Sequence, residues 1–210
     1  MPESSLSDCE IVLASASPRR RELLDQIGIH YYVQPSDVDE TMNVDETVLA
    51  HVLRLALAKA AIGHARALST GIRKPVLGAD TVVEIDGSVL GKPRDISQAL
   101  QMLTRLSGNT HRVHTAVAVV TQQGEYVDIN TSEVEFMKLD QHLIERYITT
   151  GEPMGKAGAY AIQGIAAQFV RYLRGSYSSV MGLPLYETAL LLTRCGISTL
   201  HSSLAHRQQP

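Results

Sequence analysis

The sequence contains little that would crosslink the chain or anchor it in a membrane. Its 210 residues include two cysteines, two phenylalanines and no tryptophan. Cys9 and Cys195 form no CxxC pair, so the sequence predicts neither a disulfide framework nor a zinc knuckle, and a reduced, cytoplasmic location fits best. No apolar run approaches the roughly 18 residues of a membrane span, and no signal-like segment opens the chain. We therefore expect neither a membrane partner nor export.

An excess of positive charge is also absent, since the formal net charge is −3. General nucleic-acid binders carry a basic stripe that neutralises many phosphates, so no nucleic-acid partner is expected. The chain lacks GxxxxGK[ST] and GxGxxG, which argues against a P-loop or a dinucleotide-binding fold. With 44% hydrophobic residues, the chain can bury a core over residues 1–200 as one domain or as two closely joined lobes, followed by a polar tail at 201–210.

Apolar runs and turn signals alternate along the chain and predict an α/β fold with hairpins and a mixed sheet. Asp86 and Gly87 form a strong hairpin signal. Strands are expected at residues 11–13, 31–33, 76–83, 88–90, 113–121, 126–138, 169–172 and 176–180. Helices are expected from Pro18 onward and at residues 46–68, 96–106, 139–149 and 184–195.

The most informative segment joins the first strand to the first helix. After Ile11–Leu13 come small residues that let a ligand approach the backbone, then Ser17 as a candidate N-cap and Pro18 at the first helical position. A helix N-terminus stabilises a phosphate, and Arg19 and Arg20 would add charge-assisted hydrogen bonds. The segment predicts a polyanion site, although the arginines would equally suit a solvated helix face.

Three further features suggest a site. Asp80 lies between apolar strand stretches and beside small residues that leave space, so it binds a cation, accepts hydrogen bonds, works as a base or caps a turn. Lys92 follows the hairpin in a loop suited to phosphate oxygens, which is also a common surface turn. The glycine-rich stretch 151–164 bends sharply, and its Gln163 has a donor and an acceptor to read the edge of a base.

Other candidates have simpler explanations. His111 and His114 are three residues apart in a strand, which directs them to opposite faces and disfavours a metal pair. Tyr160, Tyr172 and Tyr177 would suit base stacking, and core or interface packing explains each of them at least as well.

Several motifs together resemble one known family, the Maf nucleoside triphosphate pyrophosphatases. They are SASPRR, GADT, GKPRD, LSGNTHRVHTAV, GEPMGKAGAYAIQG and GSYSSVMGLPLYET, which span roughly residues 11 to 190 in the family's order. The set is most similar to the branch of dTTP/UTP pyrophosphatases. The resemblance implies an elongated α/β fold similar to inosine triphosphate pyrophosphatases, with a mixed sheet, flanking helices and a central cleft. It also implies a cytoplasmic homodimer that needs a divalent metal, Mg or Mn, and a nucleoside triphosphate substrate.

The resemblance assigns roles to individual residues. Asp80 is implied as the catalytic proton acceptor and, together with Glu40, as a metal ligand. Residues linked to substrate choice are Arg19, Thr81 and Gln163. Phosphate-binding positions are Ser15, Ser17, Arg20, Lys59 and Lys92.

The sequence departs from the family's usual pattern at Gly155, where many relatives carry Asp, and at Ala161, where Gly is usual. Two alternative functions stay open. One is a nucleotide-binding regulator of cell division without significant turnover, and the other is hydrolysis of 7-methyl-GTP. The second is disfavoured because that branch has a different stretch in place of GAYAIQG.

Overall fold

The computed structural model describes residues 9–198 and contains one mixed sheet of seven strands. Hydrogen-bonded neighbours follow the order β2-β1-β3-β5-β6-β7, and β4 pairs with β3. The strands are β1 (Ile11–Leu13), β2 (Tyr31–Val33), β3 (Val76–Ile85), β4 (Ser88–Leu90), β5 (Thr110–Val120), β6 (Glu125–Phe136) and β7 (Val170–Arg174). The predicted mixed α/β class with helices around a sheet is confirmed.

Six α-helices and two short 3-10 helices connect the described strands. They are α1 (Pro18–Gln26), α2 (Val48–Ser69), α3 (Ile96–Leu106), α4 (Gln141–Thr149), η1 (Ala157–Ala159), η2 (Ile165–Phe169), α5 (Tyr177–Met181) and α6 (Leu185–Arg194). Asp95 and Asp140 cap α3 and α4 by accepting the N–H groups of Gln98 and Leu143. Short polar N-caps therefore fix where these two helices begin.

The chain divides into two compact units. Unit 1 comprises Met1–Asp80, Ala116–Ile129 and Gly182–Pro210, and unit 2 comprises Thr81–Thr115 and Asn130–Met181. Strands β3, β5 and β6 each contribute residues to both units. The boundary within β3 separates Asp80 from Thr81. The expected polar tail at 201–210 lies outside the described residues.

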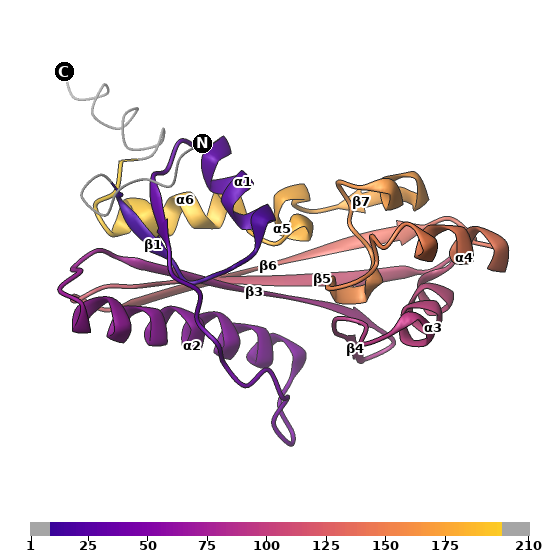
Figure 1. Cartoon of the computed structure of the whole chain (residues 1–210), viewed down its shortest axis with the longest axis horizontal. Helices are drawn as coiled ribbons and strands as arrows, with labels where there is room; N and C mark the ends of the chain where they lie inside the picture. The colour runs from indigo at the N-terminus through magenta and orange to yellow at the C-terminus, as the bar shows by residue number, and fades with distance from the viewer. Residues whose placement is uncertain (1–8, 199–210) are drawn as a thin grey trace. The chain divides into compact units, whose positions relative to one another are not determined.

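Unit 1 is built around parallel pairing of β1 with β2 and with β3. Figure 1 shows α2 on one side of these strands and α6 on the other. A Cβ added to Gly78 of β3 would lie 2.5 Å from the carbonyl oxygen of Ala56 and 2.6 Å from the amide nitrogen of Ala60, both in α2. Only glycine allows this approach of helix and strand. Gly78, one of the small residues expected to leave space beside Asp80, therefore makes room for a helix.

Helix α2 is long and apolar enough, by length and composition, to span a membrane, with 39% of its most apolar window buried. Helices of soluble cores meet the same criterion, and here Gly63 of α2 packs closely on Ala14 and on Val76 of β3. The helix also carries Lys59, whose ammonium is paired within the unit. The expectation that no membrane is involved stays a prediction.

Unit 2 has its own hydrophobic core, between antiparallel strands and helices α3 and α4. Phe136 lies at its centre and makes edge-on ring contacts with His111, Tyr160 and Phe169. Tyr160 is buried, and its hydroxyl lies 2.8 Å from His111 Nε2. Packing rather than base stacking therefore explains Tyr160.

Two local predictions are wrong. Residues 176–180 were expected to form a strand, but Tyr177–Met181 is helix α5. Ser176 starts this helix, because its hydroxyl accepts the N–H of Ser179 and its carbonyl accepts the N–H of Val180. Ser17 precedes α1 as expected, yet its side chain makes no capping hydrogen bond. Ser15 instead accepts the backbone N–H of Ser17 at 3.2 Å.

Candidate active site

Two carboxylates meet one ammonium group in unit 1. Lys59 Nζ donates to Asp80 Oδ1 and to Glu40 Oε1, each at 2.6 Å. The side chains of Lys59 and Asp80 are 10% and 9% exposed, whereas that of Glu40 is 46% exposed. The buried carboxylate thus has the cation that its burial requires, and the more accessible Glu40 closes the group on the solvent side.

The fold brings these three side chains together from distant parts of the sequence. Asp80 is the last residue of β3 that belongs to unit 1. Lys59 lies on α2, which can pack closely against β3 because residue 78 is glycine. Glu40 lies in the segment between β2 and α2, residues 34–47, which we call the Glu40 loop. Helix, strand and loop therefore each supply one member of the cluster.

Arg20, at the start of α1, is held close to the same charges. Its Nη1 donates to Ser15 Oγ at 3.0 Å and its Nε to the carbonyl oxygen of Gly182 at 2.9 Å. Burial lowers the pKa of Arg20, the carboxylates of Asp80 and Glu40 raise it, and Arg19 lowers it further. Since a guanidinium stays protonated in proteins, Arg20 supplies a fixed positive charge within the field of both acids.

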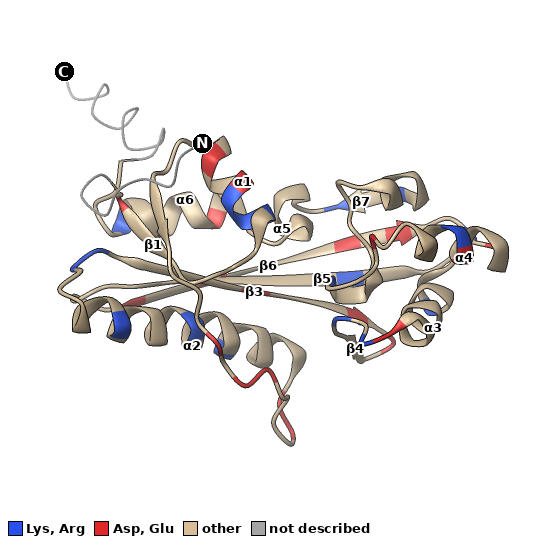
Figure 2. Ribbon diagram, viewed as in Figure 1, with Lys and Arg blue, Asp and Glu red and all other residues tan. Residues whose placement is uncertain are grey.

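The other predicted members of unit 1 lie beside Arg20. Arg19 is half-buried, and burial lowers the pKa of its guanidinium while Glu22 raises it. Ser15 is buried, with 7% of its surface exposed, and Ser17 is half-buried. Figure 2 shows basic residues at the start of α1 and along α2, and acidic residues in the Glu40 loop. Unit 1 therefore brings together Ser15, Arg20, Glu40, Lys59 and Asp80, and their roles in catalysis and binding stay predictions.

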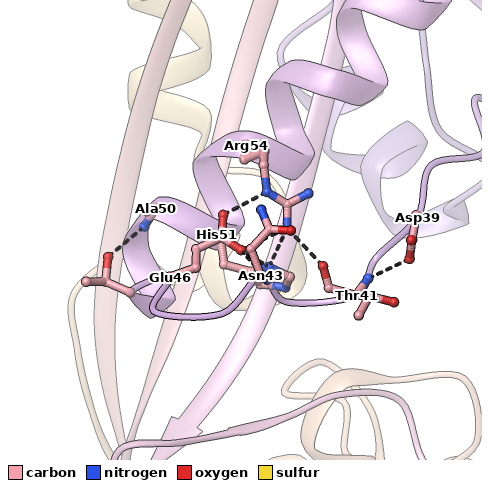
Figure 3. A network of polar contacts seen from close by, with 8 residues as sticks. Asp39, Thr41, Asn43, Glu46, Ala50, His51 and Arg54 are labelled. Atoms are coloured by element: carbon pink, nitrogen blue, oxygen red, sulfur yellow. Dashed lines mark hydrogen bonds and ion pairs between the residues drawn. The ribbon is translucent and has the colours of Figure 1, made fainter.

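A second polar network anchors the Glu40 loop to α2 (Figure 3). Arg54 of α2 donates from Nε and Nη2 to the two carboxylate oxygens of Glu46, at 2.7 and 2.8 Å. Arg54 Nη2 also donates to the carbonyl oxygen of Thr41 at 3.0 Å. On the other side of Glu40, the N–H of Thr41 donates to Asp39 Oδ1 at 2.9 Å. The backbone next to Glu40 is therefore tied to the helix that carries Lys59.

Glu46 is the centre of this network. Besides Arg54, it accepts the backbone N–H of Asn43 at 3.0 Å and lies 3.2 Å from Nδ1 of the buried His51. These contacts lower the pKa of Glu46 to about 2, and the hydrogen bond from Arg54 contributes most. Its carboxylate is consequently ionised at neutral pH and keeps its bond to the guanidinium.

The remaining predicted residues belong to unit 2. Thr81 is half-buried, and its hydroxyl lies 3.1 Å from that of Thr115, which also donates to the carbonyl oxygen of Ser179. Lys92 is exposed in the loop after β4. Gln163 is exposed in a turn between the two 3-10 helices. All three residues belong to unit 2, whereas the cluster of Glu40, Lys59 and Asp80 belongs to unit 1.

Sequence reasoning missed three residues that hold the site's loops, namely Glu46, Arg54 and Glu152. No local spacing rule links the first two, because Glu46 precedes the N-cap Thr47 and Arg54 lies eight residues further on, beyond the i,i+4 reach of side chains on one helix. His111 and His114 have separate partners, Tyr160 for the first and Glu84 and Thr131 for the second. The two side chains therefore have different surroundings, and the absence of a metal pair stays a prediction.

Carboxylates of unit 1 are the donors that a divalent cation would use. Among residues 9–198, no group of three or more His, Cys, Asp or Glu side chains is arranged to hold a metal ion. Mg²⁺, however, is usually held by one or two carboxylates together with substrate phosphates and water. Glu40 and Asp80 fit this pattern because both reach one point, the ammonium of Lys59.

Comparison with known proteins gives a consistent result over nearly the whole chain. The sequence model of the family described as Maf-like protein matches residues 10–195. A dTTP/UTP pyrophosphatase of Alkalilimnicola ehrlichii is 54% identical over 184 residues, which cover 87% of this chain and 91% of the relative. A dTTP/UTP pyrophosphatase of Burkholderia pseudomallei is 49% identical over 202 residues, with coverages of 91% and 97%. Among solved structures, the Ham1 protein of Staphylococcus aureus is 18% identical, with a TM-score of 0.40 over 60% of this chain and 71% of its own.

Proposed function

This chain belongs to the Maf-like protein family, and we propose that it hydrolyses dTTP and UTP to the nucleoside monophosphate and pyrophosphate. It is a nucleoside triphosphate pyrophosphatase. The observation that carries the proposed site is the cluster in unit 1, where Lys59 joins Asp80 to Glu40 and Arg20 lies within the field of both carboxylates. Such a group offers cations that can bind phosphate oxygens and a carboxylate that can accept a proton.

The chemistry required is an attack by water on the α-phosphorus. A nucleoside triphosphate carries about four negative charges near neutral pH, which repel a nucleophile unless they are offset. Arg19, Arg20 and Lys59 of unit 1 offset this charge by binding phosphate oxygens, and Lys92 of unit 2 is a further candidate for phosphate binding. Ser15 and Ser17 donate their hydroxyl hydrogens, and the start of α1 adds backbone N–H groups.

Asp80 accepts the proton of the attacking water. The new bond joins the water oxygen to the α-phosphorus, and the bond from that phosphorus to the oxygen bridging it to the β-phosphorus breaks. Pyrophosphate leaves with the bridging oxygen, and the monophosphate keeps the oxygen from water. Because Lys59 already contacts Asp80, it keeps the carboxylate oriented before substrate arrives.

Glu40 and Asp80 would hold a divalent cation, Mg or Mn, together with phosphate oxygens. When bound, such an ion supplies positive charge to the phosphates. Lys59 already contacts both carboxylates, and its ammonium would add positive charge for phosphate oxygens beside them.

Selection of the pyrimidine base is assigned to Gln163, together with Arg19 and Thr81. The amide of Gln163 is exposed in a turn and has both a donor and an acceptor for the edge of a small ring. A site that hydrogen-bonds such an edge rejects analogues that leave its polar groups unpaired.

The test is hydrolysis of a nucleotide panel by the purified protein with Mg²⁺ or Mn²⁺. We expect pyrophosphate from dTTP and UTP, and lower kcat/KM for dCTP, GTP and 7-methyl-GTP. Orthophosphate as the only product would indicate cleavage at the γ position and refute the proposal. Binding without turnover would favour the nucleotide-binding regulator. Cytoplasmic location and a homodimer are further parts of the proposal, testable by fractionation and by mass in solution.

A further inference from the structure

The carboxylate of Glu152 binds the backbone that directly follows Gln163, although no catalytic role falls to it. Oε2 accepts the N–H of Ile165 at 2.8 Å, and Oε1 accepts the N–H of Ala166 at 3.1 Å. The hydroxyl of Tyr147 donates to Oε1 at 2.8 Å. Three donors from two parts of unit 2 therefore converge on one half-buried carboxylate.

The support behind Glu152 is rigid. Tyr147 lies on α4 with 2% of its surface exposed, and its ring makes an edge-on contact with Phe169, with 5.0 Å between the ring centroids. The backbone carbonyl of Glu152 accepts a hydrogen bond from Lys156 Nζ at 2.6 Å. Both the main chain and the side chain of Glu152 are thus held, so the positions of the two N–H groups that it binds are fixed to the core.

The residue next to Gln163 fits against this carboxylate. A Cβ added to Gly164 would lie 2.3 Å from Oε2 of Glu152, so only glycine allows the carboxylate to approach this closely. The N–H of Gly164 donates to the carbonyl oxygen of Ala161 at 3.0 Å and closes a turn. Within the turn Ile162 is buried in the core and Gln163 is exposed. We call residues 160–164 the Gln163 loop.

The protonation state of the carboxylate agrees with this geometry. Burial raises the pKa of Glu152, but the hydrogen bonds from Ile165, Ala166 and Tyr147 lower it by more, so that the net shift is downward. Burial, followed by the hydrogen bond to Glu152, raises the pKa of Tyr147. At neutral pH an ionised acceptor therefore faces neutral donors, which gives strong hydrogen bonds.

We propose that Glu152 is a positioning residue for base recognition, which fixes the Gln163 loop so that the amide of Gln163 meets the pyrimidine edge without being ordered first. This inference rests on the proposed function. A binding group that is already in place loses little conformational entropy when the ligand arrives. It also discriminates more sharply, because a loop that cannot follow a different base leaves unpaired polar groups against it.

The test is Glu152→Gln, compared with Glu145→Gln as a matched control. Glu145 is an exposed carboxylate on α4 whose Oε1 accepts a hydrogen bond from Gln141, on the same helix. A glutamine at 152 has one acceptor oxygen and one amide donor, so it cannot accept hydrogen bonds at both ends. We expect KM for dTTP to rise about tenfold with kcat within about twofold, and the preference for dTTP over dCTP and GTP to fall about tenfold. Glu145→Gln should match wild type.

An unchanged nucleotide preference in a folded Glu152→Gln variant would overturn the inference, as would a fall in kcat alone. If that variant does not fold, Tyr147→Phe serves instead, because it removes one donor and leaves both backbone N–H bonds. It should shift KM and preference in the same direction by a smaller factor, and no shift would overturn the inference. Failure of the wild-type protein to hydrolyse dTTP would refute the proposed function instead. The role of the loop would then be read from calorimetric affinities for dTTP and dCTP, and equal losses for both would overturn it.

Discussion

The Glu40 loop of unit 1 and the Gln163 loop of unit 2 each carry an exposed polar residue. Each loop is also held by the hydrogen bonds of one carboxylate, Glu46 in the first case and Glu152 in the second. In the first loop Glu46 receives charged donors, since Arg54 binds both of its oxygens. In the second loop Glu152 receives neutral donors, which are two backbone N–H groups and the hydroxyl of a core tyrosine.

Because of this difference, the two loops should differ in how readily they change conformation. The guanidinium of Arg54 is on a side chain that is 34% exposed, so dissolved salt can screen its attraction to Glu46. The backbone N–H groups at Glu152 move only if η2 moves, and Tyr147 is fixed in the core. The Glu40 loop is therefore suited to adjust as charge enters the site, whereas the Gln163 loop is suited to keep one shape. The proposed roles of the two loops, charge compensation and base recognition, need these two different properties.

The largest effect should come from Asp80→Asn, which tests whether the chemistry belongs to unit 1. The amide cannot accept the proton of water, and general-base help is worth about 10² to 10⁴ in rate, so kcat should fall by that factor. Single-turnover rates with dTTP measure the loss. Asp86→Asn is the control, because Asp86 is exposed at the β3–β4 turn. More than a tenth of wild-type activity in Asp80→Asn would remove Asp80 from the role of base.

Lys59→Met should have the next largest effect and concerns stability as well as activity. It leaves the buried Asp80 without its cation, and breaking a buried pair by removing one partner costs about 3 kcal/mol. Urea unfolding measures this loss. Adding Asp80→Asn to Lys59→Met should recover part of the stability but none of the activity, since the uncompensated charge is then gone. If the double variant is as unstable as the single one, the ion pair is not the cause.

The sequence alone pointed to Arg19, Arg20 and Asp80, because these residues stand next to strand and helix signals. The strand–turn–helix at residues 11–20 and the acid after the apolar run in β3 needed only local reasoning. The cluster of Glu40 and Lys59 with Asp80 came from family resemblance, because no local pattern tells which face of α2 meets which strand. The role of Gly78 in that approach, and the bonds of Glu152 to Ile165 and Ala166, depend on tertiary contacts that spacing does not encode. Helix α5 was missed because residues 176–180 contain tyrosine and valine, which favour strands, while Ser176 acts as a helix-starting residue.

Gly164→Ala tests the contact between the Gln163 loop and Glu152 by changing the loop instead of the carboxylate. The added methyl group would meet the carboxylate of Glu152 and push the two segments apart. We expect the preference for dTTP over dCTP to fall about fivefold to tenfold, because misplaced polar groups discriminate poorly. Measured kcat/KM ratios should resemble those of Gln163→Ala if the clash acts through the loop. A variant that loses activity equally on every nucleotide would contradict this account.

Arg54→Met tests the adjustable loop and should have a smaller effect. Without the guanidinium, the carbonyl of Thr41 and the carboxylate of Glu46 lose their shared donor, so Glu40 spends less time at Lys59. We expect kcat/KM for dTTP to fall about threefold to tenfold. Arg66→Met, at an exposed arginine in the last turn of the same helix, is the control. The deficit should shrink at high salt, which already weakens the pair in the wild-type protein, and a deficit independent of salt would argue against an electrostatic tether.

The smallest effect concerns the pH dependence of the same tether. The pKa of Glu46 is lowered from 4.5 to about 2 in the folded protein, first by the hydrogen bond from Arg54. A depressed folded pKa adds stability that is complete above the unfolded value and disappears as the pH falls through the folded value. The difference in unfolding free energy between wild type and Glu46→Gln should therefore be constant from pH 7 to about pH 5 and should shrink between about pH 4.5 and pH 2. Urea titrations of both proteins across this range measure it. Because other titrating groups are common to both proteins, a difference that stays constant down to about pH 3 would show that Glu46 has an ordinary pKa and that Arg54 does not hold it.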